Sequence, residues 1–216
     1  MGAVKVKKRC VVIGGGEMAD PVRTLCALTP EDYVICADSG YRYAAAAGIT
    51  PDLFVGDYDS LDMKIAPSVE RLSLPTHKDV TDTHAALLEG LARGFSDFLL
   101  LGCMGGRFDH SFANLMLLQL LLDRGARGLL LYDCGSARLL QNGACDLVED
   151  GGYVSIFPWG GEAKGVTLEG FEYPLDHARL TLDNPVGVSN HLLHRRGRVR
   201  VEEGTLLLLQ VREQAD

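Results

Sequence analysis

The chain has 216 residues, 47% of them hydrophobic and 23% charged, which is enough to bury the core of one large or two modest domains. This composition excludes a protein that is disordered over most of its length. The net charge of −8 at pH 7 repels phosphate backbones, so we do not expect nucleic acid as a partner. Because no apolar run is long enough to span a bilayer and no Cys-x-x-Cys pair occurs, we expect reduced thiols, no membrane partner and a cytoplasmic location.

The first part of the chain alternates short apolar strands with helices. Strands are predicted over Arg9–Ile13, Tyr33–Ala37, Leu53–Val55, Asp97–Leu101 and Gly128–Tyr132, and helices over Tyr41–Ala47, Thr83–Arg93 and Asp109–Arg124. Apolar strands that alternate with helices are typical of a parallel sheet covered on both faces. In such sheets ligands bind at the carboxyl ends of the strands, and the Gly- and Asp-rich segments follow those ends.

The pattern changes near Gln141, beyond which no amphipathic helix is predicted. Short strands separated by turn residues are predicted over Tyr153–Phe157, Gly165–Leu168, Ala178–Leu182, Val199–Glu202 and Thr205–Val211. This pattern is typical of a small antiparallel sandwich or barrel. We therefore predict the α/β class, with a Rossmann-like parallel-sheet domain over residues 1–141 and an all-β sandwich domain over residues 142–216.

The segment Gly14–Ala19 follows the first predicted strand and fits the pattern Gly-x-Gly-x-x-Ala. Its backbone N–H groups are candidates for a phosphate cradle, although glycines that only make a tight turn explain the pattern equally well. Asp38 lies about twenty residues further on, which imitates a dinucleotide-binding fingerprint. An oxidoreductase that uses a nicotinamide cofactor is therefore one alternative function.

Acidic residues follow the predicted strands in short loops. Asp57 and Asp59 stand two residues apart directly after Leu53–Val55, so both carboxylates can reach one hard cation. Asp79 precedes the second predicted helix and has no obvious capping role. Magnesium prefers oxygen ligands from carboxylates and phosphates, so these three residues are the candidate metal ligands.

Charged residues of both signs accompany these acids. Asp82 and Asp109 stand at the starts of helices, where either can be a helix cap as well as a member of the site. Lys78 and Arg107 are candidates for contact with phosphate oxygens. Acids that converge near cations fit a polyphosphate bound together with a metal ion. The sequence contains no Walker-type Gly-x-x-x-x-Gly-Lys-Ser/Thr motif, so this would not be a P-loop enzyme.

These loops resemble those of the thiamine pyrophosphokinase (thiamine diphosphokinase) family in order and spacing. The matching segments are Ala37-Asp38-Ser39-Gly40, Gly56-Asp57-Tyr58-Asp59-Ser60, Lys78-Asp79-Val80-Thr81-Asp82, Gly105-Gly106-Arg107-Phe108-Asp109-His110 with Ala113-Asn114, and Val188-Ser189-Asn190. The resemblance implies transfer of a pyrophosphoryl group from ATP to thiamine with release of AMP. It also implies a homodimer with a shared active site, an α/β catalytic domain and a thiamine-binding β-sandwich.

The resemblance implies a role for individual residues. Magnesium and polyphosphate would be held by Asp57, Asp59 and Asp79, with the acidic site completed by Asp82 and Asp109. Binding of ATP or thiamine would involve Asp38, Lys78, Arg107, Asn114, Ser189 and Asn190. Either Asp82 or Asp109 can serve as the base, and the residues do not choose between them.

The thiamine-stacking ring is left open by the sequence. Some relatives carry an aromatic residue beyond the Ser-Asn pair, whereas this chain continues His191-Leu192-Leu193-His194 with no tryptophan. Trp159 is the single tryptophan and a possible stacking residue. A non-catalytic protein that binds a nucleotide or thiamine is the second alternative function.

Overall fold

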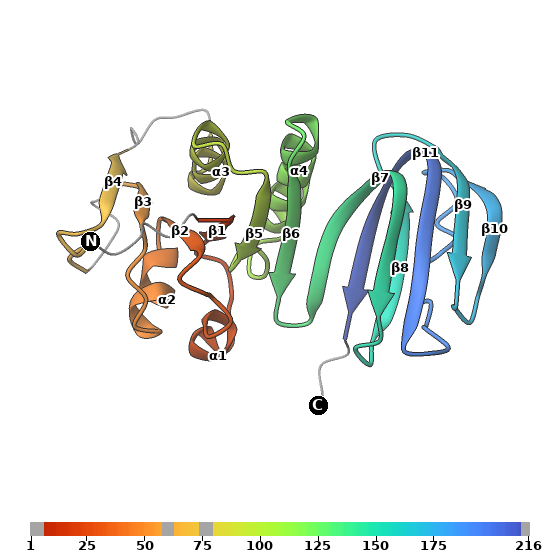
Figure 1. The fold of residues 1–216 in the computed structure, drawn as a ribbon, viewed down its shortest axis with the longest axis horizontal. Helices are drawn as coiled ribbons and strands as arrows, with labels where there is room; N and C mark the ends of the chain where they lie inside the picture. Colours follow the sequence, from red (N-terminus) through yellow and green to blue (C-terminus); the bar gives the residue numbers. More distant parts are fainter. Residues whose placement is uncertain (1–6, 58–62, 74–79, 213–216) are drawn as a thin grey trace. The chain divides into compact units, whose positions relative to one another are not determined.

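The structure is a computed structural model that describes residues 7–57, 63–73 and 80–212 (Figure 1). The chain forms two compact units, Met1–Asp133 and Cys134–Asp216. The second unit starts before the boundary predicted at residue 141, because an unpredicted long strand begins at Gly135.

The first unit contains a parallel sheet in the order β6-β5-β1-β2-β3-β4. Its strands are β1 (Arg9–Ile13), β2 (Asp32–Ala37), β3 (Leu53–Gly56), β4 (Glu70–Ser73), β5 (Asp97–Leu101) and β6 (Arg127–Tyr132). Its helices are α1 (Pro21–Leu25), α2 (Gly40–Ala46), α3 (Asp82–Ala92) and α4 (Phe108–Asp123). Figure 1 shows α1 and α2 on one side of this sheet and α3 and α4 on the other. The predicted parallel α/β arrangement is therefore confirmed.

Burial explains the apolar strands of this unit. The residues from Cys10 to Ile13 are fully buried, because helices cover both faces of β1. One face packs against α2, and the other packs against α3. Within the described residues, no helix is both long and apolar enough to cross a bilayer.

The elements α1 and β4 were not predicted. Pro21 stands in the first turn of α1, where a missing N–H group costs nothing, and the Asp20 side chain caps the helix by accepting from the Arg23 N–H at 2.9 Å. Strand β4 is an edge strand with mostly exposed side chains, so it lacks the apolar pattern of its neighbours. Helix α1 has only 5 residues, too few to show an apolar period, so neither element has the pattern on which the prediction relied.

The second unit contains antiparallel strands. They are β7 (Gly135–Val148), β8 (Tyr153–Pro158), β9 (Ala163–Glu169), β10 (Leu175–Leu180) and β11 (Arg196–Val211). The first half of β11 pairs with β9 and the second half with β8, while β7 runs along its other edge. The register of β11 is irregular between Val201 and Thr205. The two strands predicted here are therefore one strand, interrupted at the predicted turn.

Arg9 and Asp32 form an ion pair at the amino ends of β1 and β2. The Asp32 side chain is only 4% exposed, and it accepts hydrogen bonds from Arg9 Nε and Nη2 at 2.9 Å each and from the Thr29 N–H at 2.8 Å. Burial alone would raise the pKa of Asp32, but these hydrogen bonds outweigh burial and hold that pKa below its ordinary value.

Asp32→Asn is expected to lower the free energy of unfolding by about 2 kcal/mol at neutral pH, because it removes a charge-assisted pair that is partly screened on the Arg9 side. A carboxyl group with a lowered folded-state pKa stabilises fully above its unfolded pKa of about 3.9 and loses that contribution as the pH falls through the folded value. The difference from wild type should therefore narrow towards pH 3. Urea unfolding at pH 7 and pH 3 measures it, with the exposed Asp150→Asn as control. An equal difference at both pH values would contradict the assignment.

Candidate functional site

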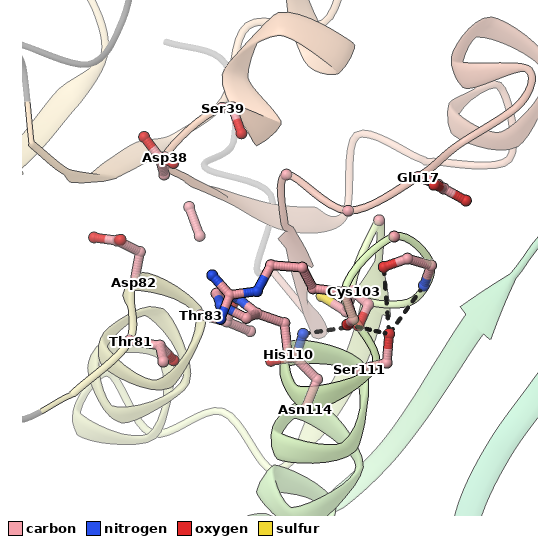
Figure 2. A pocket seen from close by; sticks show the side chains of 17 residues that line it. Glu17, Asp38, Ser39, Thr81, Asp82, Thr83, Cys103, His110, Ser111 and Asn114 are labelled. Carbon is pink, nitrogen blue, oxygen red and sulfur yellow. Dashed lines mark hydrogen bonds between the residues drawn. The ribbon is translucent and has the colours of Figure 1, made fainter.

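A pocket of about 330 Å³ lies in the first unit, at the carboxyl ends of β1, β2 and β5 (Figure 2). Its walls come from the loops after these three strands, from the first turn of α3 and from the beginning of α4. The lining residues include Asp38, Asp82, Arg107 and Asn114, which were predicted from three separate segments of the chain. The pocket stands where ligands bind in open parallel sheets.

The glycine turn after β1 is tied to the loop after β5. The Gly14 N–H donates to the Leu101 carbonyl at 2.8 Å, and the Gly16 N–H donates to the Gly102 carbonyl at 2.7 Å. A Cβ atom on Gly16 would stand 2.7 Å from the Met104 carbonyl oxygen. The glycines therefore allow loops to pack closely, and the N–H groups of Gly14 and Gly16 are engaged rather than available to a phosphate.

Asp38 follows β2 in a left-handed conformation, with φ 48°. Its N–H donates to the Val55 carbonyl at 2.9 Å, which joins the end of β2 to the end of β3. Figure 2 shows Asp38 and Ser39 on one wall of the pocket and Asp82 on another. A non-glycine residue with positive φ is uncommon and is held by its surroundings, as is often found at functional sites.

Thr81, rather than Asp82, caps α3. The Thr81 hydroxyl accepts from the His84 N–H at 3.2 Å, and Asp82 occupies the first turn of the helix. The capping interpretation of Asp82 is therefore wrong. Asp82 lines the pocket from the first turn of α3, where the positive end of the helix dipole stabilises a negative charge.

Arg107 and Asp109 form an exposed ion pair at the start of α4. Arg107 Nη2 lies 2.5 Å from Asp109 Oδ2, Arg107 Nε lies 3.1 Å from Asp109 Oδ1, and the two side chains are 72% and 63% exposed. The hydrogen bond from Arg107 holds the pKa of Asp109 below its ordinary value. Asp109 stands in the first turn of α4, whose N-cap is Arg107, so Asp109 does not cap the helix, and it is not among the residues that line the pocket.

Exposed ion pairs contribute little to stability, so Arg107 can exchange the Asp109 carboxylate for a bound phosphate at small cost. Arg107 also lines the pocket, and a guanidinium group can hold two phosphate oxygens at once.

Asp57 follows β3 directly and is half-buried. The preceding Gly56 passes so close to Asp38 that a Cβ atom on it would lie 3.3 Å from the Asp38 Cα. Asp57 therefore stands at the same edge of the sheet as the pocket. The other predicted residues of these loops, Asp59, Lys78 and Asp79, lie outside the described residues.

The donor chemistry at this edge fits a hard cation. Asp38, Asp57 and Asp82 offer carboxylate oxygens, which suit magnesium, whereas zinc favours nitrogen and sulfur. Among the residues that the structure describes, no three His, Cys, Asp or Glu side chains gather closely enough to hold a metal ion by themselves.

Several lining residues were not predicted, among them Glu17, Thr83, Cys103 and Ser111. Glu17, Cys103 and Ser111 lie in or near the glycine-rich turns, and Thr83 directly follows Asp82; these positions were the only signals available in the sequence. Cys103 is 2% exposed, and burial raises the pKa of its thiol to about 12, so it is a neutral side chain rather than a nucleophile.

In the second unit, Asn190 is 2% exposed and holds the backbone around it. Its Oδ1 accepts from the N–H groups of Tyr173 at 3.0 Å and His191 at 2.9 Å, and its Nδ2 donates to the Tyr173 carbonyl at 2.8 Å. Ser189 beside it has a left-handed φ of 56°, and its N–H donates to Ser155 Oγ at 3.0 Å. The Asn190 side chain is thus already engaged, whereas Ser189 is exposed.

Two aromatic groups of this unit bear on ring stacking. The His191 ring packs on Tyr153 with ring centroids 4.5 Å apart. Trp159 is half-buried, and its backbone N–H donates to the Thr205 carbonyl at 2.8 Å.

Comparison with known proteins matches both parts of the chain to one family. Residues 26–129 match the model "Thiamin pyrophosphokinase, catalytic domain", and residues 144–206 match "Thiamin pyrophosphokinase, vitamin B1 binding domain". The thiamine pyrophosphokinase of Bacillus subtilis (strain 168) is 29% identical over 208 residues, covering 93% of this chain and 96% of the relative.

Solved structures show the same fold over the whole chain. The thiamine pyrophosphokinase of Bacillus subtilis superposes with a TM-score of 0.88 at 26% identity, covering 96% of this chain and all of the other. The protein from Geobacillus thermodenitrificans superposes with a TM-score of 0.84 at 25% identity, covering 96% and 99% of the two chains.

Proposed function

The chain belongs to the thiamine pyrophosphokinase family, and on that premise we propose that it transfers the diphosphoryl group of ATP to the hydroxyl of thiamine, releasing AMP. The observation that carries the proposal is the pocket at the carboxyl ends of β1, β2 and β5, which collects Asp38, Asp82 and Arg107. Carboxylates beside an arginine suit a polyphosphate that arrives with a cation, because neither charge is then left uncompensated.

The polyphosphate of ATP would lie against the start of α4. Arg107 would contact its oxygens, the helix N-terminus would favour the negative charge, and Lys78 would add a second cation. Asp57, Asp59 and Asp79 would hold magnesium, which when bound would neutralise charge on the polyphosphate.

The reaction is an in-line substitution at the β-phosphorus of ATP. The thiamine hydroxyl oxygen forms a new P–O bond, the bond from the β-phosphorus to the bridging oxygen breaks, and that oxygen leaves on AMP. We assign Asp82 as the group that takes the hydroxyl proton, because Asp82 lines the pocket and Asp109 does not.

Thiamine would be bound by the second unit at Ser189, with Asn190 fixing the local backbone rather than contacting the ligand.

A homodimer is supported by exposed apolar side chains on α4, where Phe108 is 81% and Met116 54% exposed. Sedimentation analysis of the purified chain tests this association. The six free thiols agree with a cytoplasmic location.

The decisive assay measures AMP formed from ATP and thiamine, with and without Mg²⁺, and with other small alcohols in place of thiamine. AMP that requires both thiamine and Mg²⁺ supports the proposal, and its absence with intact ATP binding would indicate a non-catalytic protein. The nicotinamide alternative is not supported, since both matched models belong to the thiamine pyrophosphokinase family. The glycine turn that suggested it has two of its N–H groups engaged.

A further inference from the structure

Ser111 is a buried polar residue of α4, 7% exposed, that faces the loop before its own helix. Its Oγ accepts from the Gly105 N–H at 3.1 Å and can donate to the Arg107 carbonyl at 3.2 Å or the Gly105 carbonyl at 3.4 Å. Figure 2 shows these hydrogen bonds running from Ser111 to the loop. One hydroxyl group therefore connects the helix to two points of the loop.

A second anchor stands three residues further along α4, on the same side of the helix. Asn114 Nδ2 donates to the Cys103 carbonyl at 2.7 Å, which holds the beginning of the loop. Ser111 holds the end of the loop at Gly105 and Arg107. The loop between β5 and α4 is thus fixed to α4 at both ends.

The anchored loop has an uncommon conformation that needs such support. Gly105 and Gly106 are consecutive residues with positive φ, 91° and 66°. A Cβ atom on Gly105 would lie 2.7 Å from the Glu17 Cβ, so the loop also passes close to the turn after β1. Two adjacent glycines are otherwise free to adopt many conformations, and the loop would lose its order without its anchors.

We propose that Ser111 is a positioning residue for polyphosphate binding, acting through the Gly105–Arg107 loop to fix where the Arg107 guanidinium stands. This inference rests on the proposed function for the identity of the ligand. Helix α4 does not need the hydroxyl group, because alanine is a better helix former than serine. Gly105 is itself exposed, so water can reach the loop when the hydroxyl group is removed. The Ser111 hydroxyl group therefore supports the Gly105–Arg107 loop at the pocket rather than helix α4 itself.

The first test compares Ser111→Ala with Ser111→Thr. Ser111→Ala is expected to raise the KM for ATP and the Kd for a non-hydrolysable ATP analogue about fivefold, which corresponds to one lost neutral hydrogen bond. The KM for thiamine and the midpoint of thermal unfolding should stay close to wild type. Ser111→Thr keeps a hydroxyl that can reach the same carbonyl and should restore ATP binding. Ser136→Ala, a buried serine of the second unit, is the matched control.

A double-mutant cycle with Arg107→Ala tests the route of the effect. If Ser111 acts by placing Arg107, then Ser111→Ala should change analogue binding less than twofold in the Arg107→Ala background. Full fivefold loss in that background would overturn the inference, as would wild-type ATP binding by Ser111→Ala or equal weakening of ATP and thiamine binding.

The outcomes also separate this inference from the proposed function. Absence of AMP formation by the wild-type chain would refute the proposed function, yet titration with the ATP analogue would still compare wild type with Ser111→Ala. An active wild type with unchanged ATP binding in Ser111→Ala would refute the positioning role alone. A wild type that binds no ATP analogue would refute both.

Discussion

Asp57→Ala is expected to lower the rate of AMP release from ATP and thiamine by at least about a hundredfold. A carboxylate that helps to hold the cation at a polyphosphate contributes several kcal/mol to the transition state, which corresponds to a factor of a hundred or more. The structure places Asp57 directly after β3, with its backbone beside Asp38 at the edge that carries the pocket. Steady-state kinetics at saturating ATP and thiamine measure the effect.

The magnesium dependence of the rate separates a metal ligand from a merely acidic neighbour. Asp57→Asn, which keeps one weaker oxygen ligand, should need more Mg²⁺ than wild type for half-maximal rate. Asp150→Ala removes an exposed acid from the turn between β7 and β8 and should match wild type. Near-normal turnover by Asp57→Ala at low Mg²⁺ would show that this residue does not hold the cation.

Gly40→Ala is expected to destabilise the first unit by about 3 kcal/mol and to abolish activity with it, since overpacking at a rigid backbone contact reaches the upper end of its usual cost. A Cβ atom at Gly40 would stand 2.1 Å from the Ile13 carbonyl oxygen and 2.9 Å from the Gly14 carbonyl oxygen. Both atoms belong to backbone, which cannot rotate away as a flexible side chain can.

Urea unfolding monitored by far-UV circular dichroism measures this change. Gly161→Ala is the matched control, because a Cβ atom there would meet nothing within 4 Å. Ordinary surface substitutions change the free energy of unfolding by up to about 0.5 kcal/mol. If the free energy of unfolding of Gly40→Ala lies within that range of the wild-type value, the close contact between α2 and β1 is contradicted.

Most of the first unit could be predicted because its signals are local. Strands that are buried on both faces read as continuous apolar runs, so β1 and β5 were predicted with their observed bounds. Edge strand β4 is mostly exposed and gives no such run. Strand β7 has buried residues at its start and mostly exposed or half-buried residues beyond them, rather than a regular alternation. Its backbone is also irregular at Asn142, whose φ is 42°, so the sequence did not indicate one continuous strand.

The candidate site was predictable only as a set of loops. Asp38, Asp82 and Arg107 came from separate motifs, and the sheet brings them into one pocket because the carboxyl ends of parallel strands share an edge. The sequence did not distinguish a cap from a pocket residue at Asp82, since acids serve both purposes at the start of a helix. That choice depended on Thr81 accepting the hydrogen bond from His84.

The sequence by itself determined the alternation of strands and helices, the change to an all-β second part and the ordered acidic loops that carry the family resemblance. These features are local patterns or fixed spacings, which need no knowledge of distant contacts. Only the tertiary structure decided that the glycine turn after β1 packs against other loops, that Asn190 is engaged with backbone and that Ser111 anchors the loop between β5 and α4. Each of these depends on hydrogen bonds to backbone groups of loops elsewhere in the fold, and such partners leave no periodic signal in a sequence.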